Sequence, residues 1–356
     1  MSLTRRRAVL GIVAVFTTAA LSGASGGSAA LASGEVVVYL AADEATARPV
    51  LEAFERKTGT KVRVVAHDAS SGEALSKRVR EAKADAVWSS EPMRAIALAH
   101  EGLLARHDTP TAKARESQWI GRDARWHGFG ARLGGFLVNT ADGVERPNDE
   151  LSPDRWQFRH SYAPGFSYGM FVIGRPESSD SLAHLAMVHS MWGAGHFQAW
   201  CFQSRRQELR VVPDDAEAAL AVARREAGAG LVDSLHAARV RGEGVDAEFV
   251  AVDHEIAVSI DRPVQFGGVM VIPQVVGVVE SGANRANAAR FVDFVLSPEA
   301  ERLLMGGAPG AFVPLHREHG EAFRAGVPGP AAEVNLDDAA EKVPEMLRIF
   351  RRAFPE

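Results

Sequence analysis

Residues 35–44, EVVVYLAADE, decide the fold class. Val36 to Leu40 form the near-continuous apolar run that is typical of a strand covered on both faces of a parallel sheet. Helical spacing follows at once in the apolar residues Ala47, Val50, Leu51 and Phe54. We therefore expect the central strand of an open α/β sheet. Ala41–Glu44 then lies at its carboxyl end, where ligands of such sheets bind.

The strand–loop–helix pattern occurs twice more in the following residues. Strand patterns cover 61–66 and 84–88, and each precedes a helical pattern. Ser70 and Glu73 have capping-box spacing for a helix that ends near residue 82, and Pro92 suits the first turn of the next helix. These repeated units predict a doubly wound α/β lobe.

Two long, glycine-bearing extended runs, 126–140 and 267–279, suit strands that cross between lobes. Between them, the pattern predicts a helix near 181–192, a further helix that carries Phe197, Trp200 and Cys201, and a helix at 216–226. It also predicts strands at 209–212 and 229–232. After 267–279 it predicts helices at 287–296 and from 298 to about 305. The length of the chain without its N-terminal segment favours two lobes over one.

Residues 1–32 have the composition of an export signal. Arg5–Arg7 are positive, Val9–Leu21 are apolar but short for a membrane span, and Ala30-Leu31-Ala32 is a cleavage site. We expect cleavage near Ala32 and a periplasmic mature protein. The arginines also fit a twin-arginine signal, so the choice between Sec and Tat export stays open, as does a retained membrane anchor.

Composition indicates an acidic exported protein. The chain has 40 basic and 45 acidic residues, and losing Arg5–Arg7 lowers the basic count to 37, a net charge of about −8. Such a surface is unsuited to nucleic acid. Cys201 is the only cysteine, so no disulfide forms within the chain. We expect a monomer with no nucleic-acid partner.

Six stretches of the sequence, taken in order, resemble the extracellular solute-binding proteins of ABC importers. The resemblance covers roughly residues 35–316, and the ferric-iron and phosphonate-like binders are the branch that it indicates. The stretches are VVVYLAADEATARPVLEAFERKTGTKV, ADAVWSSEPMRAIALAHEGLL, WHGFGARLGGFLVNT, RVVPDDAEAALAVARREAGAGLVDS, GGVMVIPQVVGVVESG and ANAARFVDFVLSPEAERLL. The family resemblance implies an α/β fold of the periplasmic-binding-protein type II, with two doubly wound lobes joined by crossing strands.

The resemblance also implies a division of the chain. Lobe 1 is expected at 33–131 and 272–308, and lobe 2 at 132–271 and 309–356, with crossings near 131–133, 271–273 and 308. The implied function is capture of a small solute and its delivery to an ABC permease in the inner membrane, without a cofactor. A ligand-sensing partner of a membrane receptor is the alternative in another class. An exported enzyme is the least favoured, because the usual catalytic motifs are missing from the sequence.

Candidate ligand-binding residues follow the predicted strands or occupy the crossing strand, where helix N-termini present free N–H groups. They are Asp43, Glu44, Ser70, Ser71, Ser89, Ser90, Arg132, Ser167, Tyr168, Asp214 and Asp233. The serines can donate hydrogen bonds, and Arg132 can hold a carboxylate or phosphonate. The pattern therefore favours a small anionic or zwitterionic solute. Helix capping remains open for the acidic residues and for Ser70 and Ser71, and an inter-lobe salt bridge remains open for Arg132.

A ferric-iron site is the alternative, and the tyrosines count against it. Family members that bind ferric iron use adjacent tyrosines, whereas this chain has only Tyr39, Tyr162 and Tyr168. Leu235 and His236 stand where the resemblance implies the pair. His184 and His189 are five residues apart on one predicted helix, which places them on different faces. The sequence therefore predicts no metal site.

Overall fold

The computed structural model describes residues 34–67, 74–141, 171–177, 180–254 and 267–355. The expected export signal lies outside these ranges. So do four predicted ligand-binding residues, Ser70, Ser71, Ser167 and Tyr168. No helix among the described residues is both long enough and apolar enough to cross a membrane.

The predicted strands at the start of the chain form a parallel sheet. β1 (Glu35–Ala41) lies between β2 (Lys61–Ala66) and β3 (Ala86–Ser89), and both pairings are parallel. Val36 to Leu40 are all buried, as their apolar run predicts. The strand expected at 84–88 begins two residues later than predicted. The carboxyl ends of β1 and β3 therefore lie side by side at one edge of the sheet.

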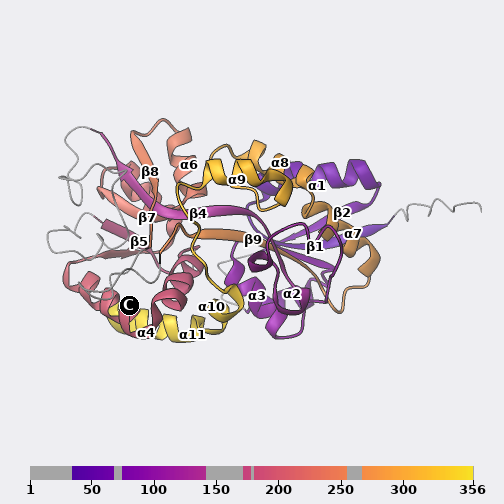
Figure 1. Ribbon diagram of the computed structural model, residues 1–356, viewed down its shortest axis with the longest axis horizontal. Helices are drawn as coiled ribbons and strands as arrows, with labels where there is room; N and C mark the ends of the chain where they lie inside the picture. The colour runs from indigo at the N-terminus through magenta and orange to yellow at the C-terminus, as the bar shows by residue number, and fades with distance from the viewer. Residues whose placement is uncertain (1–33, 68–73, 142–170, 178–179, 255–266, 356) are drawn as a thin grey trace, which may run out of the picture. The chain divides into compact units, whose positions relative to one another are not determined.

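The sheet continues through the two long extended runs (Figure 1). β9 (Val271–Val278) pairs antiparallel with β3 on one side and with β4 (His127–Asn139) on the other. The full order is β2-β1-β3-β9-β4-β7-β5-β6, and β8 also pairs with β4. The bounds of the remaining strands are β5 (Phe171–Gly174), β6 (Arg210–Val212), β7 (Ala229–Asp233) and β8 (Ala247–Ala251).

β4 changes partners along its length, which makes it a crossing strand. Residues 127–133 pair with β9, and residues 134–139 pair with β7 and β8. Gly135 is required at the change of partner, because a Cβ atom there would lie 2.2 Å from the Val250 carbonyl oxygen. Arg132, placed in a crossing strand by the sequence, therefore sits next to the point where β4 leaves one group of strands for the other.

Two helices around β1–β3 have the caps that the sequence predicts. α1 (Glu44–Thr58) ends at Gly59 with φ 70°, and α8 (Pro298–Gly307) begins with the Ser297 side chain capping it. α2 (Leu75–Glu81) begins after Ala74, and the expected capping box of Ser70 and Glu73 lies outside the described residues. The other helices of this group are α3 (Pro92–His100) and α7 (Arg285–Val295).

The remaining helices include one that merges two predicted helices. α4 (Ser181–Arg206) runs through both, with a kink at Gly193, whose φ of 77° is outside the helical region. The other helices are α5 (Asp215–Ala223), α6 (Ser234–Gly242), α9 (Gly320–Gly326), α10 (Leu336–Glu341) and α11 (Val343–Ala353). Short 3₁₀ turns occupy Ser117–Trp119, Arg122–Ala124 and Arg317–His319.

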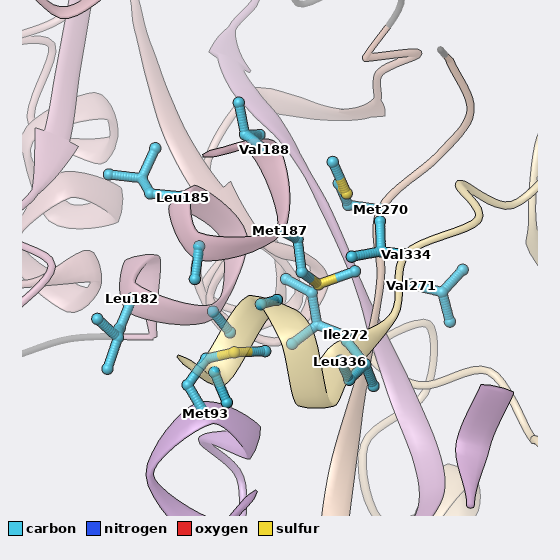
Figure 2. Packing of buried hydrophobic residues seen from close by; sticks show 14 of the residues in the cluster. Met93, Leu182, Leu185, Met187, Val188, Met270, Val271, Ile272, Val334 and Leu336 are labelled. Carbon is cyan, nitrogen blue, oxygen red and sulfur yellow. The ribbon is translucent and has the colours of Figure 1, made fainter. Parts of the chain in front are cut away.

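Helix α10, near the C-terminus, packs against both α3 and α4. Figure 2 shows Met93 of α3, Ile272 of β9 and Leu336 of α10 gathered in one buried cluster. Burying a side chain of this size contributes roughly 1.5–3 kcal/mol. The Asp337 carboxylate adds polar contacts, since it accepts hydrogen bonds from Trp126 Nε1 at 3.0 Å and from the Arg122 amide at 2.9 Å. The C-terminal segment therefore joins elements that are far apart in the sequence.

Candidate ligand-binding cleft

The carboxyl ends of β1, β3 and β7 and the N-termini of α3, α4, α5 and α6 border a cleft with two adjoining cavities. Their volumes are about 260 Å³ and 250 Å³. The residues that line both cavities are Ala41, His67, Ser90, Asp180 and His236. This is the strand edge at which Ala41–Glu44 and the loop after β3 were predicted to meet a ligand.

Two serines after β3 form part of the wall, and both hydroxyls hydrogen-bond to the backbone. Ser89 Oγ donates to the Glu91 carbonyl at 2.9 Å, and Ser90 Oγ donates to the Ala41 carbonyl at 3.3 Å. The backbone amide of Ser90 donates to the same Ala41 oxygen. These contacts fix the loop between β3 and α3 against the end of β1.

Arg132 is fully buried and its charge is matched by carboxylates. Its Nη1 contacts Asp180 at 2.8 Å and also donates to Asp233, while Nη2 donates to the Ser90 carbonyl. Burial acts to lower the pKa of Arg132, but Asp180 and Asp233 outweigh it and raise that pKa. Of the two interpretations of Arg132, the structure contains the salt bridge. Its guanidinium is not a free anion-binding group.

Asp233 is the hub of a second set of contacts at the end of β7. It caps α6 by accepting hydrogen bonds from the Leu235 and His236 amides, both at 3.0 Å, and His236 Nδ1 lies 2.9 Å from Asp233 Oδ1. Burial acts to raise the Asp233 pKa, but Arg132 and His236 bring it well below its usual range. Burial acts to lower the pKa of His236, and Asp233 raises it to about 9.

Asp214 and Asp215 begin α5 and behave differently. Asp214 caps the helix by accepting from the Glu217 amide at 2.8 Å, as the alternative for this residue predicts. Asp215 is only 3% exposed and accepts a hydrogen bond from the Ser181 hydroxyl through Oδ1. Within the described residues, its second oxygen has no hydrogen-bond partner. Burial raises the pKa of Asp215 to about 7, and the nearby charges of Asp180 and Asp233 act in the same direction.

Glu91 caps α3 in the cleft wall. Its carboxylate accepts from the Met93 amide at 3.1 Å and from the Arg94 amide at 2.7 Å. Desolvation nevertheless raises the Glu91 pKa to about 7, because the backbone bonds and the Arg94 charge offset only part of the cost. The Arg94 guanidinium in turn donates to the Glu177 carbonyl.

Asp43 and Glu44 have separate roles. Asp43 caps α1 through a 2.7 Å bond from the Thr46 amide and lies 2.9 Å from the Arg239 guanidinium of α6. It lines one cavity. Glu44 is exposed, pairs with Arg48 along α1, and does not line either cavity. The contact between Asp43 and Arg239 therefore links β1 and α6 across the cleft.

Part of this cleft was predicted from the sequence. Asp43, Ser89, Ser90, Arg132 and Asp214 line it, and Asp233 supports Arg132 and His236 from behind the wall. The charged and histidine residues that were not predicted are His67, Glu91, Arg94, Asp180, Asp215, His236 and Arg239. The missed acidic residues cap or begin helices, so their pattern is that of ordinary capping residues. The only sign in the sequence that they bind a ligand is that acidic residues recur near the ends of successive predicted strands.

Three of the residues that line the cleft have the donor types of a metal site. One oxygen each of Asp180 and Asp215 and one ring nitrogen of His236 all lie within 4.8 Å of one another. Neither His184 nor His189 belongs to this group. His184 Nε2 instead lies 2.6 Å from His254 Nε2 in the interior. The prediction that the chain has no metal-type cluster therefore overlooked His236.

Comparison with known families identifies the chain. Residues 36–306 match the model of the bacterial extracellular solute-binding proteins. This protein belongs to that family. Members of the family bind solutes outside the cytoplasm, and the expected resemblance is confirmed. Comparison of the sequence with curated proteins finds no match.

Solved structures confirm the two-lobed type II fold of this solute-binding protein. Iron-bound HitA from Pseudomonas aeruginosa has 19% identity and a TM-score of 0.70, with coverage of 90% of this chain and 99% of HitA. IdiA (FutA) of Trichodesmium, with iron and citrate, has 16% identity and a TM-score of 0.72, with coverage of 91% and 100%. AfuA from Actinobacillus pleuropneumoniae, with fructose-6-phosphate, has 15% identity and a TM-score of 0.70, with coverage of 90% and 98%.

Proposed function

We propose that this solute-binding protein captures a small solute that carries both a positive and a negative charge and delivers it to an ABC permease. The observation that carries the proposal is the charge pattern of the cleft. Arg132, Arg239 and His236 each contact a carboxylate already, while Asp215 has no cationic partner in contact. A ligand with no positive charge would leave the Asp215 carboxylate without a compensating cation in contact with it among the described residues.

The cleft also contains groups that can bind the negative charge of such a solute. Arg94 and His67 line the same cavity as Asp215. The N-terminus of α4 also opens there, and its N-cap residue Asp180 makes no capping hydrogen bond. A helix N-terminus attracts negative charge because its first amides are unpaired and its dipole is positive. A zwitterionic solute, or an anion bound together with a cation, can match both the acidic and the basic groups of the cleft.

Capture is proposed to occur by closure of the two lobes on the solute. β4 changes partners from β9 to β7 and β8 along its length, and the walls of the cleft come from both groups of strands. Closure removes water from the polar groups and strengthens their contacts with the ligand. The expected division into lobes, with crossings near 131–133, 271–273 and 308, stays a prediction, as do a monomeric state and a cleaved signal.

Thermal unfolding of the ligand-free protein in the presence of candidate solutes tests the proposal. The panel contains amino acids, inorganic and organic anions with and without divalent metal ions, polyamines, sugars and ferric citrate. A ligand present at a hundred times its dissociation constant stabilises by about 2.7 kcal/mol. We expect stabilisation by a zwitterion or by an anion together with a cation. Stabilisation by a simple anion alone, or by no solute at all, overturns the proposal.

Two variants connect the binding to the cleft. Asp215→Asn removes the unpaired carboxylate and is expected to weaken binding of the stabilising solute at least tenfold, about 1.4 kcal/mol. Asp214→Asn is the matched control, because it changes the adjacent residue while asparagine remains a good N-cap. Equal affinities of the two variants would place the ligand elsewhere.

Ferric iron is the second candidate, favoured by the iron-bound structures that share the fold. Fe³⁺ is a hard cation that prefers several oxygen ligands. Tyr39 is the only tyrosine among the described residues, and it is 1% exposed with its hydroxyl 2.8 Å from His67 Nδ1. Stabilisation by ferric citrate alone, with no effect of other solutes, would favour iron over the dipolar solute. The same panel does not distinguish delivery to a permease from delivery to a membrane receptor. The family itself consists of binding proteins rather than enzymes.

A further inference from the structure

The cleft contains a group of side chains that a simple capping role does not explain. Asp180, Asp215 and His236 come from the N-termini of α4, α5 and α6, and each offers a metal-ligand atom. The three atoms lie within 4.8 Å of one another. Ligand atoms around a metal ion with bonds of about 2.0–2.2 Å lie roughly 3–4 Å apart, so a small closing movement completes the set.

The contacts behind His236 orient it for such a role. His236 Nδ1 lies 2.9 Å from Asp233 Oδ1, and Asp233 is held in turn by Arg132 and by the amides at the start of α6. Imidazoles that bind metal ions commonly donate the other ring N–H to a carboxylate, which fixes the ring and its tautomer. With Nδ1 used in this way, Nε2 is the nitrogen left for an ion in the cleft.

Asp215 supplies the second, independent observation. Asp215 is only 3% exposed, yet only its Oδ1 has a hydrogen-bond partner in the described part of the chain. A carboxylate oxygen that reaches the cavity without a protein hydrogen-bond partner is available to bind a ligand. Asp215 lines the larger of the two cavities together with Asp180 and His236. The unpaired oxygen therefore lies where a bound cation would compensate it.

The charges of the whole cluster favour a divalent ion. Once an ion takes the place of the proton on His236 Nε2, the cluster contains the carboxylates of Asp180, Asp215 and Asp233 against the single guanidinium of Arg132. Two negative charges are then left over, and a divalent cation neutralises both. The donor set of two carboxylates and one imidazole suits Mn²⁺, Fe²⁺, Co²⁺ or Zn²⁺.

We infer that Asp180, Asp215 and His236 form a binding site for a divalent first-row metal ion in the cleft, with Asp233 orienting His236. The inference rests on the proposed function, because it identifies the positive charge of the captured solute as a metal ion. Three protein ligands leave coordination positions open for water or for the solute. The site differs from a ferric site in that it contains no phenolate and uses an imidazole that the sequence places where a tyrosine was expected.

Calorimetric titration of the chelator-treated full chain with Mn²⁺ and Zn²⁺ tests the inference. We expect one site per chain. Loss of an outer-shell partner of a metal ligand costs about 10–100-fold in affinity, and His236→Gln and Asp215→Asn, which remove a ligand, are expected to cost at least that much. The controls are Glu44→Gln and His196→Gln, which change a carboxylate and an imidazole outside the cleft and are expected to bind the ions as the unaltered chain does.

The outcomes separate this inference from the proposed function. Metal binding that is lost in His236→Gln and Asp215→Asn and kept in both controls supports the site. Binding that is unaffected by these two variants overturns it, because the ion is then held elsewhere. If neither ion binds while an organic zwitterion stabilises the protein, the metal site is wrong and the proposed function stands. If neither ions nor solutes bind, both are wrong. Circular dichroism of each variant checks that it has folded.

Discussion

Replacing Arg132 by methionine should destabilise the protein strongly, because Arg132 contacts two buried or half-buried carboxylates, Asp180 and Asp233. Arg132 is 0% exposed, and its partners Asp233 and Asp180 have side chains that are 4% and 21% exposed. Removing one partner of a buried ion pair costs about 3–5 kcal/mol, since the other charge remains without compensation. Methionine retains most of the side-chain volume, so the loss of unfolding free energy comes mainly from the missing charge and not from a cavity.

The expected shift in melting temperature follows from the size of the chain. Unfolding entropy of about 2.1 cal/mol/K per residue gives roughly 0.7 kcal/mol/K for about 320 residues. A loss of about 3–5 kcal/mol therefore lowers Tm by about 4–8 °C. Differential scanning calorimetry and urea unfolding of Arg132→Met measure the two quantities independently.

Two further variants show whether the ion pair is the cause. Asp233→Asn in the Arg132→Met background removes the charge left behind, so the double variant should be more stable than the sum of the single effects by about 0.5–3 kcal/mol. Arg122→Met is the control, because Arg122 is 58% exposed and its pairs with Asp338 and Glu341 are worth about 0–1 kcal/mol. A loss below about 1 kcal/mol for Arg132→Met, or strict additivity, would refute the reasoning.

Three other predictions concern buried groups away from the cleft. His127 is fully buried with neither ring nitrogen hydrogen-bonded in the described structure, and burial, followed by the Arg115 charge, lowers its pKa to about 3. Because the unfolded chain binds this proton at higher pH than the folded one, stability should fall as pH drops from about 6.5 toward 3, by up to about 1.4 kcal/mol per pH unit. His127→Leu should lose less stability than the unaltered protein between pH 7.5 and 5 in urea titrations. Asp337→Asn should cost about 1–3 kcal/mol in the same assay, because the charged acceptor for Trp126 Nε1 is lost. Cys201 should not react with a thiol reagent in the native state, since it is 0% exposed and burial raises its thiol pKa.

Each of these has a measurable failure. Equal pH slopes for His127→Leu and the unaltered chain would mean that His127 is protonated or absent from the proton balance. For Asp337, the adjacent Asp338→Asn is the control, because Asp338 is 45% exposed and pairs only with the exposed Arg122. Equal losses from these two variants would contradict the role given to Asp337. Stoichiometric labelling of Cys201 before unfolding would show that its surroundings open readily.

The strands and most helix ends could be predicted from the sequence because their signals are local. The apolar run from Val36 to Leu40, Gly59 after α1 and Ser297 before α8 each act within a few residues. α2 was harder, because Ser70 and Glu73 satisfy the spacing of a capping box although the helix begins only at Leu75. Capping residues signal where a helix can begin, and tertiary packing decides where it does.

The charge of the cleft could not be predicted from the sequence, because it depends on long-range pairs. Arg132 and Asp233 are 101 residues apart, and nothing in the spacing of either indicates that they meet. The sequence therefore left both an anionic ligand and a salt bridge open for Arg132, and the fold shows that its guanidinium contacts Asp180 and Asp233. His236 was noticed only as the residue that stands in place of a tyrosine. Its value as a ligand became visible once Asp180 and Asp215 were placed beside it.

The place of β9 in the sheet has a consequence for the way in which the chain is made. β9 (Val271–Val278) inserts between β3 and β4, so a strand from late in the sequence joins two strands from its first half. A chain that emerges N-terminus first exposes one unpaired edge of β3 and one of β4 until residue 278 has followed. Unpaired strand edges are sites of aggregation. During biosynthesis this protein therefore passes through an interval in which these edges are open to aggregation, and a truncation before residue 271 leaves them open permanently.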